Sequence, residues 1–129
     1  LKQMKIESML VESMKLYDDG ICAIVALTLE MMAEVGAEKS DIEDISSFVG
    51  QVEGVSTGIT LRQKELGGWK LSMRTNPSIL NASETCAKLG GGGHAAASGA
   101  VLDDMPLDQA IAAVIAAVEE VQGSKLTPV

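Results

Sequence analysis

Residues 55–63 and 69–74 alternate apolar and polar side chains, and a connection that contains Gly67 and Gly68 joins the two segments. Strict alternation is typical of β-strands that bury one face, and this connection suits a β-hairpin. When the apolar faces of two hairpin strands match, their polar faces must match as well. The sequence therefore predicts a two-stranded antiparallel ribbon with one apolar and one polar surface.

The alternation assigns each side chain of the ribbon to a surface. The apolar surface takes Val55, Thr57, Ile59, Leu61, Trp69, Leu71 and Met73. The polar surface takes Ser56, Gly58, Thr60, Arg62, Lys70, Ser72 and Arg74. Three cationic side chains are thus expected on one surface.

Charge is distributed unevenly along the chain. The formal net charge is −8, which argues against a general nucleic-acid binder. Residues 55–102, however, contain five basic and two acidic residues, whereas the rest of the chain contains five lysines and sixteen acidic residues. Positive charge confined to one segment can form a local anion-attracting site on an otherwise acidic protein. The alternative is a chance unevenness of surface charge.

Helices and further strands are predicted on both sides of the hairpin. Apolar residues at helical spacing predict helices over 1–17 and 79–89, the latter capped by Asn81 or Ser83, and a final helix between Pro106 and Gly123. Thr28 can cap a short helix that runs to about residue 35 and ends at Gly36, and a second short helix is expected after Ser40. The apolar run 21–27 is typical of a strand covered on both faces, and 98–102 is a short strand.

These elements predict a mixed α/β (α+β) fold, with a four- to five-stranded sheet and flanking helices in a single domain. The chain has 129 residues, enough for one core, and only 2% aromatic residues, so the core must be aliphatic. Cys22 and Cys86 have apolar neighbours and are expected to be reduced core thiols. Neither a membrane-spanning run nor a signal peptide is evident, so a soluble, cytoplasmic protein is expected. The first residue, Leu1, suggests a piece of a longer polypeptide.

The run Gly90-Gly91-Gly92-Gly93, followed at once by His94, is the feature most suggestive of chemistry. Successive glycines carry an entropic cost, and their backbone N–H groups can form a concave nest for phosphate or carboxylate oxygens. His94 can donate a hydrogen bond to a phosphate oxygen. The run lacks the spacing of a nucleoside triphosphate loop or a dinucleotide-binding loop. The alternative is a flexible connection between two elements.

No arrangement of residues predicts a reaction centre. His94 is the single histidine, and no clustered acidic residues accompany it in the sequence, so a catalytic zinc or manganese site is not expected. Ser-His-Asp and Cys-His arrangements are not supported by spacing either. The sequence therefore predicts binding residues without catalytic or metal-ligating ones.

Three segments, 58–64, 70–76 and 88–102, together resemble the DHH-associated C-terminal domain of DHH-family phosphoesterases. The resemblance is closest to the branch of small oligoribonucleases that also act on 3′-phosphoadenosine 5′-phosphate. It extends from about Tyr17 to Val121, and the Gly-Gly-Gly-Gly-His block is its specific part. In that family a larger N-terminal domain carries Asp-His-His and related motifs that hold two manganese ions, and none of those motifs is present in this sequence.

The resemblance implies a substrate-binding domain that faces the metal centre of the N-terminal domain across a cleft. The implied substrate-binding residues are Arg74, the glycines 90–93 and His94, with Arg62 as a weaker correspondence. The implied division is a helix at 1–17 after an interdomain linker, the domain itself at 18–123, and a tail at 124–129. The implied partners are a short oligonucleotide or nucleotide phosphate and the N-terminal DHH domain of the same polypeptide. The resemblance also allows a homodimer, and it implies no membrane. The isolated chain is expected to bind no manganese and to be inactive.

Two other functions remain open at this point. Alanyl-tRNA synthetases carry a related C-terminal domain that contacts tRNA, although a net charge of −8 fits RNA binding poorly. A dimerisation or regulatory domain with an unused glycine loop is the third possibility.

Overall fold

A mixed sheet of six strands organises the described part of the chain, residues 1–38, 40–41, 49 and 52–129 of a computed structural model. The strands are β1 (Lys15–Tyr17), β2 (Cys22–Leu27), β3 (Thr57–Gln63), β4 (Trp69–Thr75), β5 (Gly92–Gly93) and β6 (Ala97–Leu102). The helices are α1 (Lys2–Ser13), α2 (Leu29–Val35), α5 (Ala82–Ala87) and α6 (Leu107–Gln122), with a 3-10 turn, η1, at Asp18–Gly20. The predicted α/β class is confirmed, and the short edge strands β1 and β5 bring the sheet to six strands.

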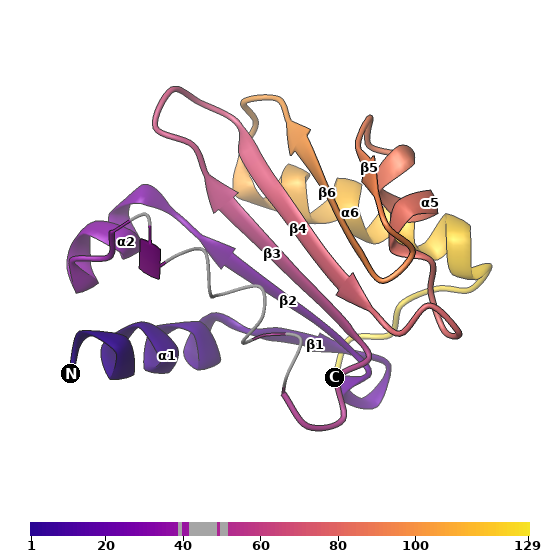
Figure 1. Cartoon of the computed structure of the whole chain (residues 1–129), viewed down its shortest axis with the longest axis horizontal. Helices are drawn as coiled ribbons and strands as arrows, with labels where there is room; N and C mark the ends of the chain where they lie inside the picture. The colour runs from indigo at the N-terminus through magenta and orange to yellow at the C-terminus, as the bar shows by residue number, and fades with distance from the viewer. Residues whose placement is uncertain (39, 42–48, 50–51) are drawn as a thin grey trace.

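The spatial order of the strands is β1-β2-β3-β4-β6-β5, as Figure 1 shows. β2 and β3 are parallel, and every other neighbouring pair is antiparallel. The parallel pair needs a long crossover connection, and the chain between β2 and β3 contains α2. The predicted hairpin is the β3–β4 pair, in which Arg62 lies opposite Lys70 and Gly58 lies opposite Arg74.

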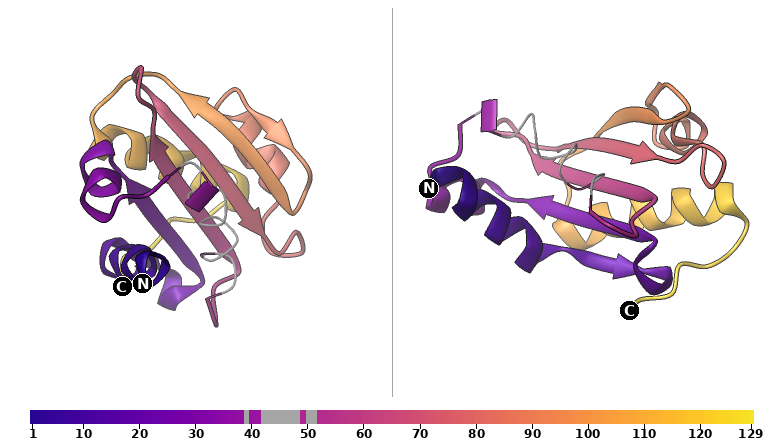
Figure 2. Two further views of the ribbon diagram at one scale, coloured as in Figure 1. Left: turned by 60° about the vertical axis from the view of Figure 1, so that its left-hand side comes forward. Right: turned by 60° about the horizontal axis from the view of Figure 1, so that its bottom comes forward.

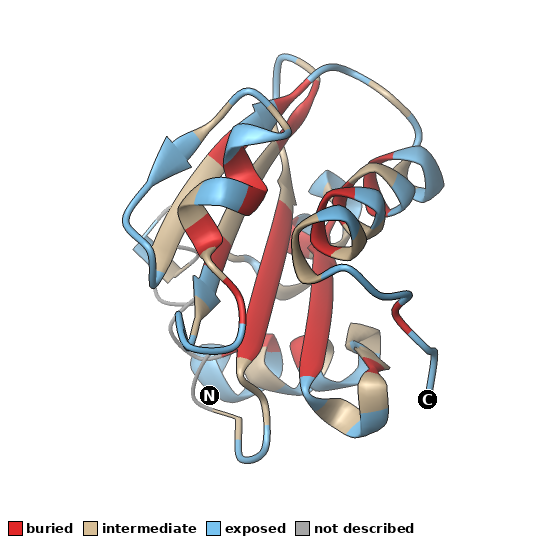
Figure 3. Cartoon of the chain, turned by 90° about the vertical axis from the view of Figure 1, so that its right-hand side faces the viewer, coloured by how far each residue is buried: buried red, intermediate tan, exposed pale blue. Residues whose placement is uncertain are grey.

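Two apolar clusters cover opposite faces of the sheet. Alternate residues of β2 belong to different clusters, since Ile24 packs on one face and Val25 on the other. The larger cluster joins β3, β4 and β6 to α5 and α6, which lie behind the sheet in Figure 1, and the smaller one joins β2 to α1 and α2. Figure 3 shows the buried residues along the interior strands and on the helix faces turned toward them. The core is aliphatic, as predicted, but it is divided between two faces.

Several predicted helix boundaries are confirmed by hydrogen bonds. The Thr28 side chain accepts a bond from the Met31 N–H at the start of α2, and Gly36 ends that helix in the left-handed conformation. Asn81, one of the two candidate caps, accepts a bond from the Glu84 N–H at the start of α5. Gly123 ends α6 with φ +77°. None of the helices in the described residues is long and apolar enough to span a bilayer.

The predicted helix over 1–17 is wrong in its last residues. α1 ends at Ser13, and Lys15–Tyr17 forms β1, antiparallel to β2. Tyr17 and Leu16 point to opposite faces of the sheet and pack into different clusters. Pairing of β1 with β2 provides hydrogen-bond partners for backbone groups at the edge of the sheet. The spacing of apolar residues along the chain contains no information about this tertiary contact, which here decides the structure.

Other boundaries also differ from prediction, and the strand predicted over 98–102 begins one residue earlier, at Ala97. The helix predicted over 79–89 is limited to Ala82–Ala87. Val55 precedes β3 and packs with the smaller cluster, not with the apolar surface of the hairpin. The strand predicted over 21–27 begins at Cys22, because Ile21 ends the turn η1 with right-handed helical backbone angles and donates its N–H to the Asp18 carbonyl. Most of the helix expected after Ser40 lies outside the described residues.

The far end of the hairpin is attached to the segment after β6. The indole Nε1 of Trp69 donates a hydrogen bond of 2.9 Å to the Met105 carbonyl. Gly68 has φ +91°, and a Cβ there would lie 2.6 Å from the Leu102 carbonyl oxygen. The two-glycine connection is therefore required both for its backbone conformation and for this close approach.

Leu71 provides a test of the larger cluster. Its side chain in β4 is fully buried, whereas Leu66 at the hairpin turn is fully exposed. We expect Leu71→Ala to lower the free energy of unfolding by about 2–5 kcal/mol, through lost burial and the cavity that remains. The matched control Leu66→Ala should change it by no more than about 0.5 kcal/mol. Urea unfolding of both variants measures this, and equal effects would contradict the described packing.

Candidate phosphate-binding face

The strand register gathers the candidate residues into rows that cross one face of the sheet. Arg74 lies opposite Ala97, and Ala97 exchanges backbone hydrogen bonds of 2.8 and 3.2 Å with His94 across the β5–β6 turn. Directly opposite residues of antiparallel strands point to the same face. Arg74, Ala97 and His94 therefore share a face, although they are far apart in sequence.

Two further rows run parallel to the first. The middle row contains Gly92, Gly99, Ser72 and Thr60, and the outer row contains Val101, Lys70 and Arg62. Exposure increases across the middle row, from buried Thr60 through half-buried Ser72 to exposed Gly92. α1 and α2 thus cover this face near β2, and it opens toward β4, β6 and β5. The open part, formed by the residues of these rows in β3, β4, β5 and β6, is called the polar face below.

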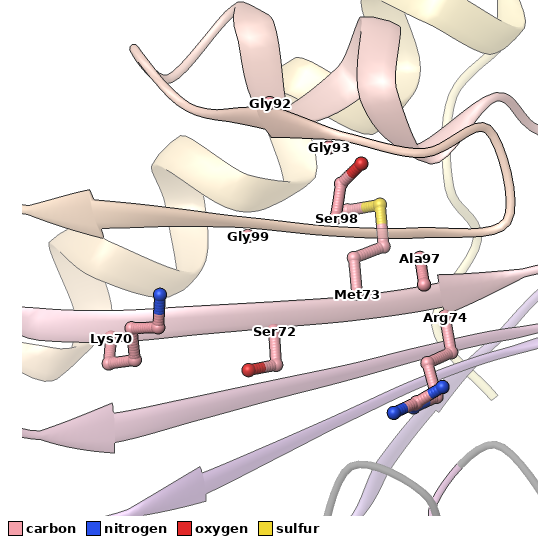
Figure 4. Close-up of a pocket in the computed structure, with 9 residues that line it drawn as sticks. All are labelled: Lys70, Ser72, Met73, Arg74, Gly92, Gly93, Ala97, Ser98 and Gly99. Atoms are coloured by element: carbon pink, nitrogen blue, oxygen red, sulfur yellow. The ribbon is translucent and has the colours of Figure 1, made fainter.

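A shallow hollow of about 340 Å³ lies on the open side. Its lining residues are Lys70, Ser72, Met73, Arg74, Gly92, Gly93, Ala97, Ser98 and Gly99. In Figure 4, Ser72 and Arg74 point to one side of β4, whereas Met73 points to the other, beside Ser98. Of the residues predicted to bind substrate, Arg74, Gly92 and Gly93 line the hollow.

Small residues in the middle of the polar face leave the hollow free of large side chains. Gly99 has no side chain, and a Cβ there would lie 2.9 Å from the Leu71 carbonyl oxygen and 3.4 Å from the Lys70 ammonium nitrogen. The Lys70 ammonium therefore extends from β4 over Gly99. This cation borders the hollow, as Arg74 does from the other side.

The glycine run does not form the predicted nest of free N–H groups. The Gly90 N–H donates to the Ala87 carbonyl, the Gly91 N–H to the Cys86 carbonyl at 2.8 Å, and the His94 N–H to the Ala97 carbonyl. Gly92 and Gly93 form β5 at the edge of the sheet. The alternation of an antiparallel ladder directs the Gly93 N–H away from β6, because the flanking pairs carry the bonds. The run is thus a turn followed by an edge strand.

The glycines are required by close packing and backbone conformation. A Cβ on Gly91 would lie 2.1 Å from the Gly99 carbonyl oxygen. Gly90 and Gly93 have φ of +80° and +150°. Gly92 differs from all three, since its φ is not positive and a Cβ there would meet nothing within 4 Å. Gly92 is therefore the position where a methyl group would project over the polar face without disturbing the fold.

The turn that carries His94 is attached to two other elements. The Ala95 carbonyl accepts hydrogen bonds from the Ala82 N–H at 2.8 Å and from the Thr75 hydroxyl at 3.1 Å. The Ala96 carbonyl accepts from the Thr75 N–H. These bonds fix the position of the turn relative to β4, so they argue against the alternative of a flexible connection. His94 itself is exposed.

No acidic side chain of the described residues pairs with the cations of the polar face. The ion pairs of the described residues lie elsewhere and join Lys2 to Glu38 and Asp41, Lys88 to Glu120, and Lys125 to Glu119. Arg62, Lys70 and Arg74 form none of these pairs. Cations without acidic partners, placed around a hollow lined by small residues, are suited to bind a phosphate or carboxylate ligand.

Sequence comparison identifies the family of the chain. Residues 8–123 match the DHHA1 domain family. The chain belongs to that family. The resemblance to the DHH-associated domain of DHH-family phosphoesterases is thereby confirmed. Over 94 residues, 73% of this chain, the sequence is 38% identical to the bifunctional oligoribonuclease and PAP phosphatase NrnA of Thermus thermophilus.

Two solved structures have the same fold as this DHHA1 domain. An exopolyphosphatase-related protein from Bacteroides fragilis matches 95% of the chain and 35% of its own length, with a TM-score of 0.82 and 23% identity. A pGpG-specific phosphodiesterase from Vibrio cholerae matches 95% of the chain and 40% of its own length, with a TM-score of 0.64 and 16% identity. The matched region spans 28% of the length of the Thermus protein, and 35% and 40% of these two structures.

The resemblance assigns two manganese ions to an N-terminal domain and none to this chain. Nowhere in the described residues of this DHHA1 domain do three His, Cys, Asp or Glu side chains come together. Cys22 and Cys86 are free thiols in the core, as predicted. Burial raises the pKa of Cys22 to about 12 and that of Cys86 to about 11, so neither is a thiolate near neutral pH. The polar face, as the structure describes it, offers cations and backbone groups, which suit an anion.

Six residues of the hollow were not among the predicted substrate-binding residues: Lys70, Ser72, Met73, Ala97, Ser98 and Gly99. Lys70 and Ser72 were already assigned to the polar surface by alternation, which was a sufficient signal. Ala97 and Gly99 have no such signal, because their role is to leave space beside β4. Conversely, Arg62 does not line the hollow, although Lys70, directly opposite it on β4, does.

Gly91 and Gly92 form a matched pair for testing this geometry. We expect Gly91→Ala to lower the free energy of unfolding by at least about 1–3 kcal/mol, because the new methyl group would overlap the Gly99 carbonyl. Gly92→Ala should instead raise it by about 0.4–1 kcal/mol, because the unfolded chain loses conformational freedom. Thermal and urea unfolding distinguish the two. A strongly destabilised Gly92→Ala variant would contradict the open environment described for that residue.

Proposed function

We propose that this DHHA1 domain binds a phosphate group of a short oligonucleotide or nucleotide within a DHH-family phosphoesterase. The observation that carries the proposal is the register that brings Arg74, His94 and Gly92 onto one open face beside a hollow. The 38% identity to an oligoribonuclease and PAP phosphatase supports the choice of substrate class.

Arg74 is the proposed main phosphate ligand. Its guanidinium is exposed and free of acidic partners among the described residues, and a planar guanidinium can donate two parallel hydrogen bonds to a phosphate. Ala97 lies beside it and leaves room for the ligand. His94, on the far side of Ala97, can donate a further hydrogen bond to the same group or to its neighbour.

Gly92 and Gly93 are proposed to line the edge of the site without side chains that would keep the ligand away from the backbone. Both line the hollow at the sheet edge, where the Gly93 N–H is directed away from β6 and is available to an approaching oxygen. The sequence predicted a nest of several N–H donors. The proposed site instead uses one donor, the Gly93 N–H, and the space that the missing glycine side chains leave for the ligand. Close approach of ligand to backbone is the proposed reason for glycine at position 92, since packing does not require it.

The hydrolytic step is assigned in this proposal to an accompanying DHH domain that would hold the manganese ions. Two such ions would activate water for attack and would stabilise the charge that develops on the phosphate. The DHHA1 domain would orient the substrate phosphates and neutralise part of their charge. On its own, the 129-residue chain is therefore proposed to bind without hydrolysing.

Arg74→Ala in the full-length enzyme tests the proposal. Loss of a charged hydrogen bond to phosphate costs about 1.5–3 kcal/mol, so kcat/KM for a dinucleotide should fall roughly 10- to 150-fold. The free energy of unfolding should change by no more than about 0.5 kcal/mol, because Arg74 is exposed. Steady-state kinetics and thermal melts measure both. Lys125→Ala, which removes a cation near α6, should change neither quantity.

Gly92→Ala and His94→Ala complete the test. Both should weaken substrate binding with the fold intact, the first by obstructing approach and the second by removing a donor. Unchanged kcat/KM in Arg74→Ala, Gly92→Ala and His94→Ala would reject the polar face as the substrate site. Selective loss of binding to structured RNA in these variants, with no effect on dinucleotides, would instead favour an RNA-binding module.

A further inference from the structure

Residues 126–129 follow α6 and lie along the edge of β1 that β2 does not occupy, and they are called the strap below. β1 is the first strand in the spatial order of the sheet and is only three residues long. In Figure 1 the chain passes from α6, behind the sheet, to the end of β1. The strap lies outside the range 8–123 that matches the DHHA1 family, and it lies at the opposite edge of the sheet from β5. Its contacts are therefore separate from the proposed phosphate site.

Backbone hydrogen bonds join the strap to β1 as an antiparallel pair. The Asp18 N–H donates to the Thr127 carbonyl at 2.8 Å, and the Val129 N–H donates to the Leu16 carbonyl at 3.1 Å. A carboxylate oxygen of Asp18 also accepts from the Thr127 N–H at 2.9 Å. Both backbone groups of Thr127 thus bind to one residue. The strap also provides partners for backbone groups at the edge of β1.

The strap is also anchored to the core and to α6. The Leu126 side chain is buried and belongs to the larger cluster. Its N–H donates a hydrogen bond of 2.8 Å to a carboxylate oxygen of Glu119, in the last turn of α6. Burial of a leucine and a hydrogen bond to a carboxylate each stabilise this position. The strap therefore has a defined place in the fold.

An unusual backbone conformation accompanies the contact between Asp18 and Thr127. Asp18 and Asp19 have φ of +52° and +59°, and among the described residues no others except glycines have positive φ. This conformation is unfavourable for residues with a Cβ, although aspartate adopts it more readily than most. The Asp18 carboxylate binds the strap, whereas the exposed Asp19 side chain makes no hydrogen bond or ion pair within the described part of the chain. Attachment of the strap is thus a reason for aspartate at position 18 that position 19 lacks.

Pro128 occupies the position of the strap where a missing N–H costs no hydrogen bond to β1. Thr127 and Val129 carry the bonds, so the residue between them directs its backbone groups away from β1. Any other residue there would present an N–H donor along the outer edge of the sheet, whereas proline presents none. Proline on an edge strand is one means by which proteins prevent pairing with further strands. The strap thus covers the edge of β1 and is itself a poor template for another strand.

We propose that the strap closes this edge of the sheet and prevents β1 from pairing with the same edge of a second copy. The free edge of a strand is a template for a further strand, and an identical chain offers an identical edge with which to pair. Asp18 and Leu126 hold the strap in place, and Pro128 prevents the strap itself from accepting another strand. The inference goes beyond the proposed function at Arg74, because it concerns the opposite edge of the sheet.

Hydrogen exchange in the full-length enzyme tests the attachment of the strap. Asp18→Gly removes the carboxylate but suits the positive φ, and Asp19→Gly is its matched control. Loss of a hydrogen bond to a charged group should speed exchange of the Thr127 and Val129 amides at least about 10-fold in Asp18→Gly. Asp19→Gly should leave this exchange unchanged, and Asp18→Asn, which keeps a side-chain acceptor, should retain most of the protection. Unchanged protection of β3 and β4 reports that the fold is intact.

Sedimentation velocity over a wide range of protein concentration tests the closed edge. Asp18→Gly and Leu126→Asp should both release the strap, the second by placing a charge at a buried position. Both should form larger species than the unmodified enzyme as concentration rises. Pro128→Thr should keep the strap protected but give its outer edge an N–H donor, so it should also associate. Thr127→Ser, at an exposed side chain, should behave as the unmodified enzyme.

Exchange at Asp18 identifies the edge that pairs. In Leu126→Asp the Asp18 amide should lose protection in dilute solution and regain it in the associated species, which would support pairing through β1. Three results would overturn the proposal. They are equal exchange of the strap amides in all variants, no association of Asp18→Gly and Leu126→Asp at any concentration, and larger species of Asp18→Gly in which the Thr127 and Val129 amides stay protected.

Discussion

The position of β4 between β3 and β6, antiparallel to both, is the constraint on which the rest of the structure depends. Because neighbouring side chains point to the same face, this register places residues from three segments of the chain in common rows. Residues 71 and 73 of β4 enter the larger apolar cluster, and residues 70, 72 and 74 face the hollow. A slip by one residue would exchange the two sets. The burial of Leu71 and Met73 therefore holds the cations of the same strand in place.

Absent side chains contribute as much to the polar face as the cations do. Gly99 allows the Lys70 ammonium to lie against β6, and Gly91 allows the turn after α5 to approach the carbonyl of Gly99. These two glycines belong to different segments and meet at one point. The close approach brings the β5 edge strand to the side of β6. Glycine is required by close packing at position 91 and by a positive φ at positions 90 and 93, and these requirements offset the entropic cost of the run. Within the run, only Gly92 has no structural reason to be glycine.

The sequence predicted the parts of the fold that local periodicity and capping determine. The hairpin, α2 with its Thr28 cap and the end of α6 at Gly123 were all predicted correctly, because each depends on residues close together in the chain. β1 was missed because its pairing with β2 is a tertiary contact, which overrides the helical spacing of Met14 and Tyr17. The nest was wrong because the carbonyls that accept from Gly90, Gly91 and His94 cannot be located without the fold. Alternation placed Arg62 and Arg74 on one surface but gave no information about what lies between them.

Arg62 and Arg74 lie in different rows of the polar face. Arg74 lies in the row that ends at the tightly attached turn of His94, whereas Arg62 lies in the row that ends at exposed Val101. Hydrogen bonds from Thr75 and Ala82 hold the turn of His94 at one end of the sheet. At the other end, the Trp69 indole donates to the Met105 carbonyl, and the Gln63 side chain accepts from the Leu29 N–H. Contacts between segments far apart in the chain thus hold both ends, so the spacing of the cations along β4 is set by the whole fold and not by the hairpin alone.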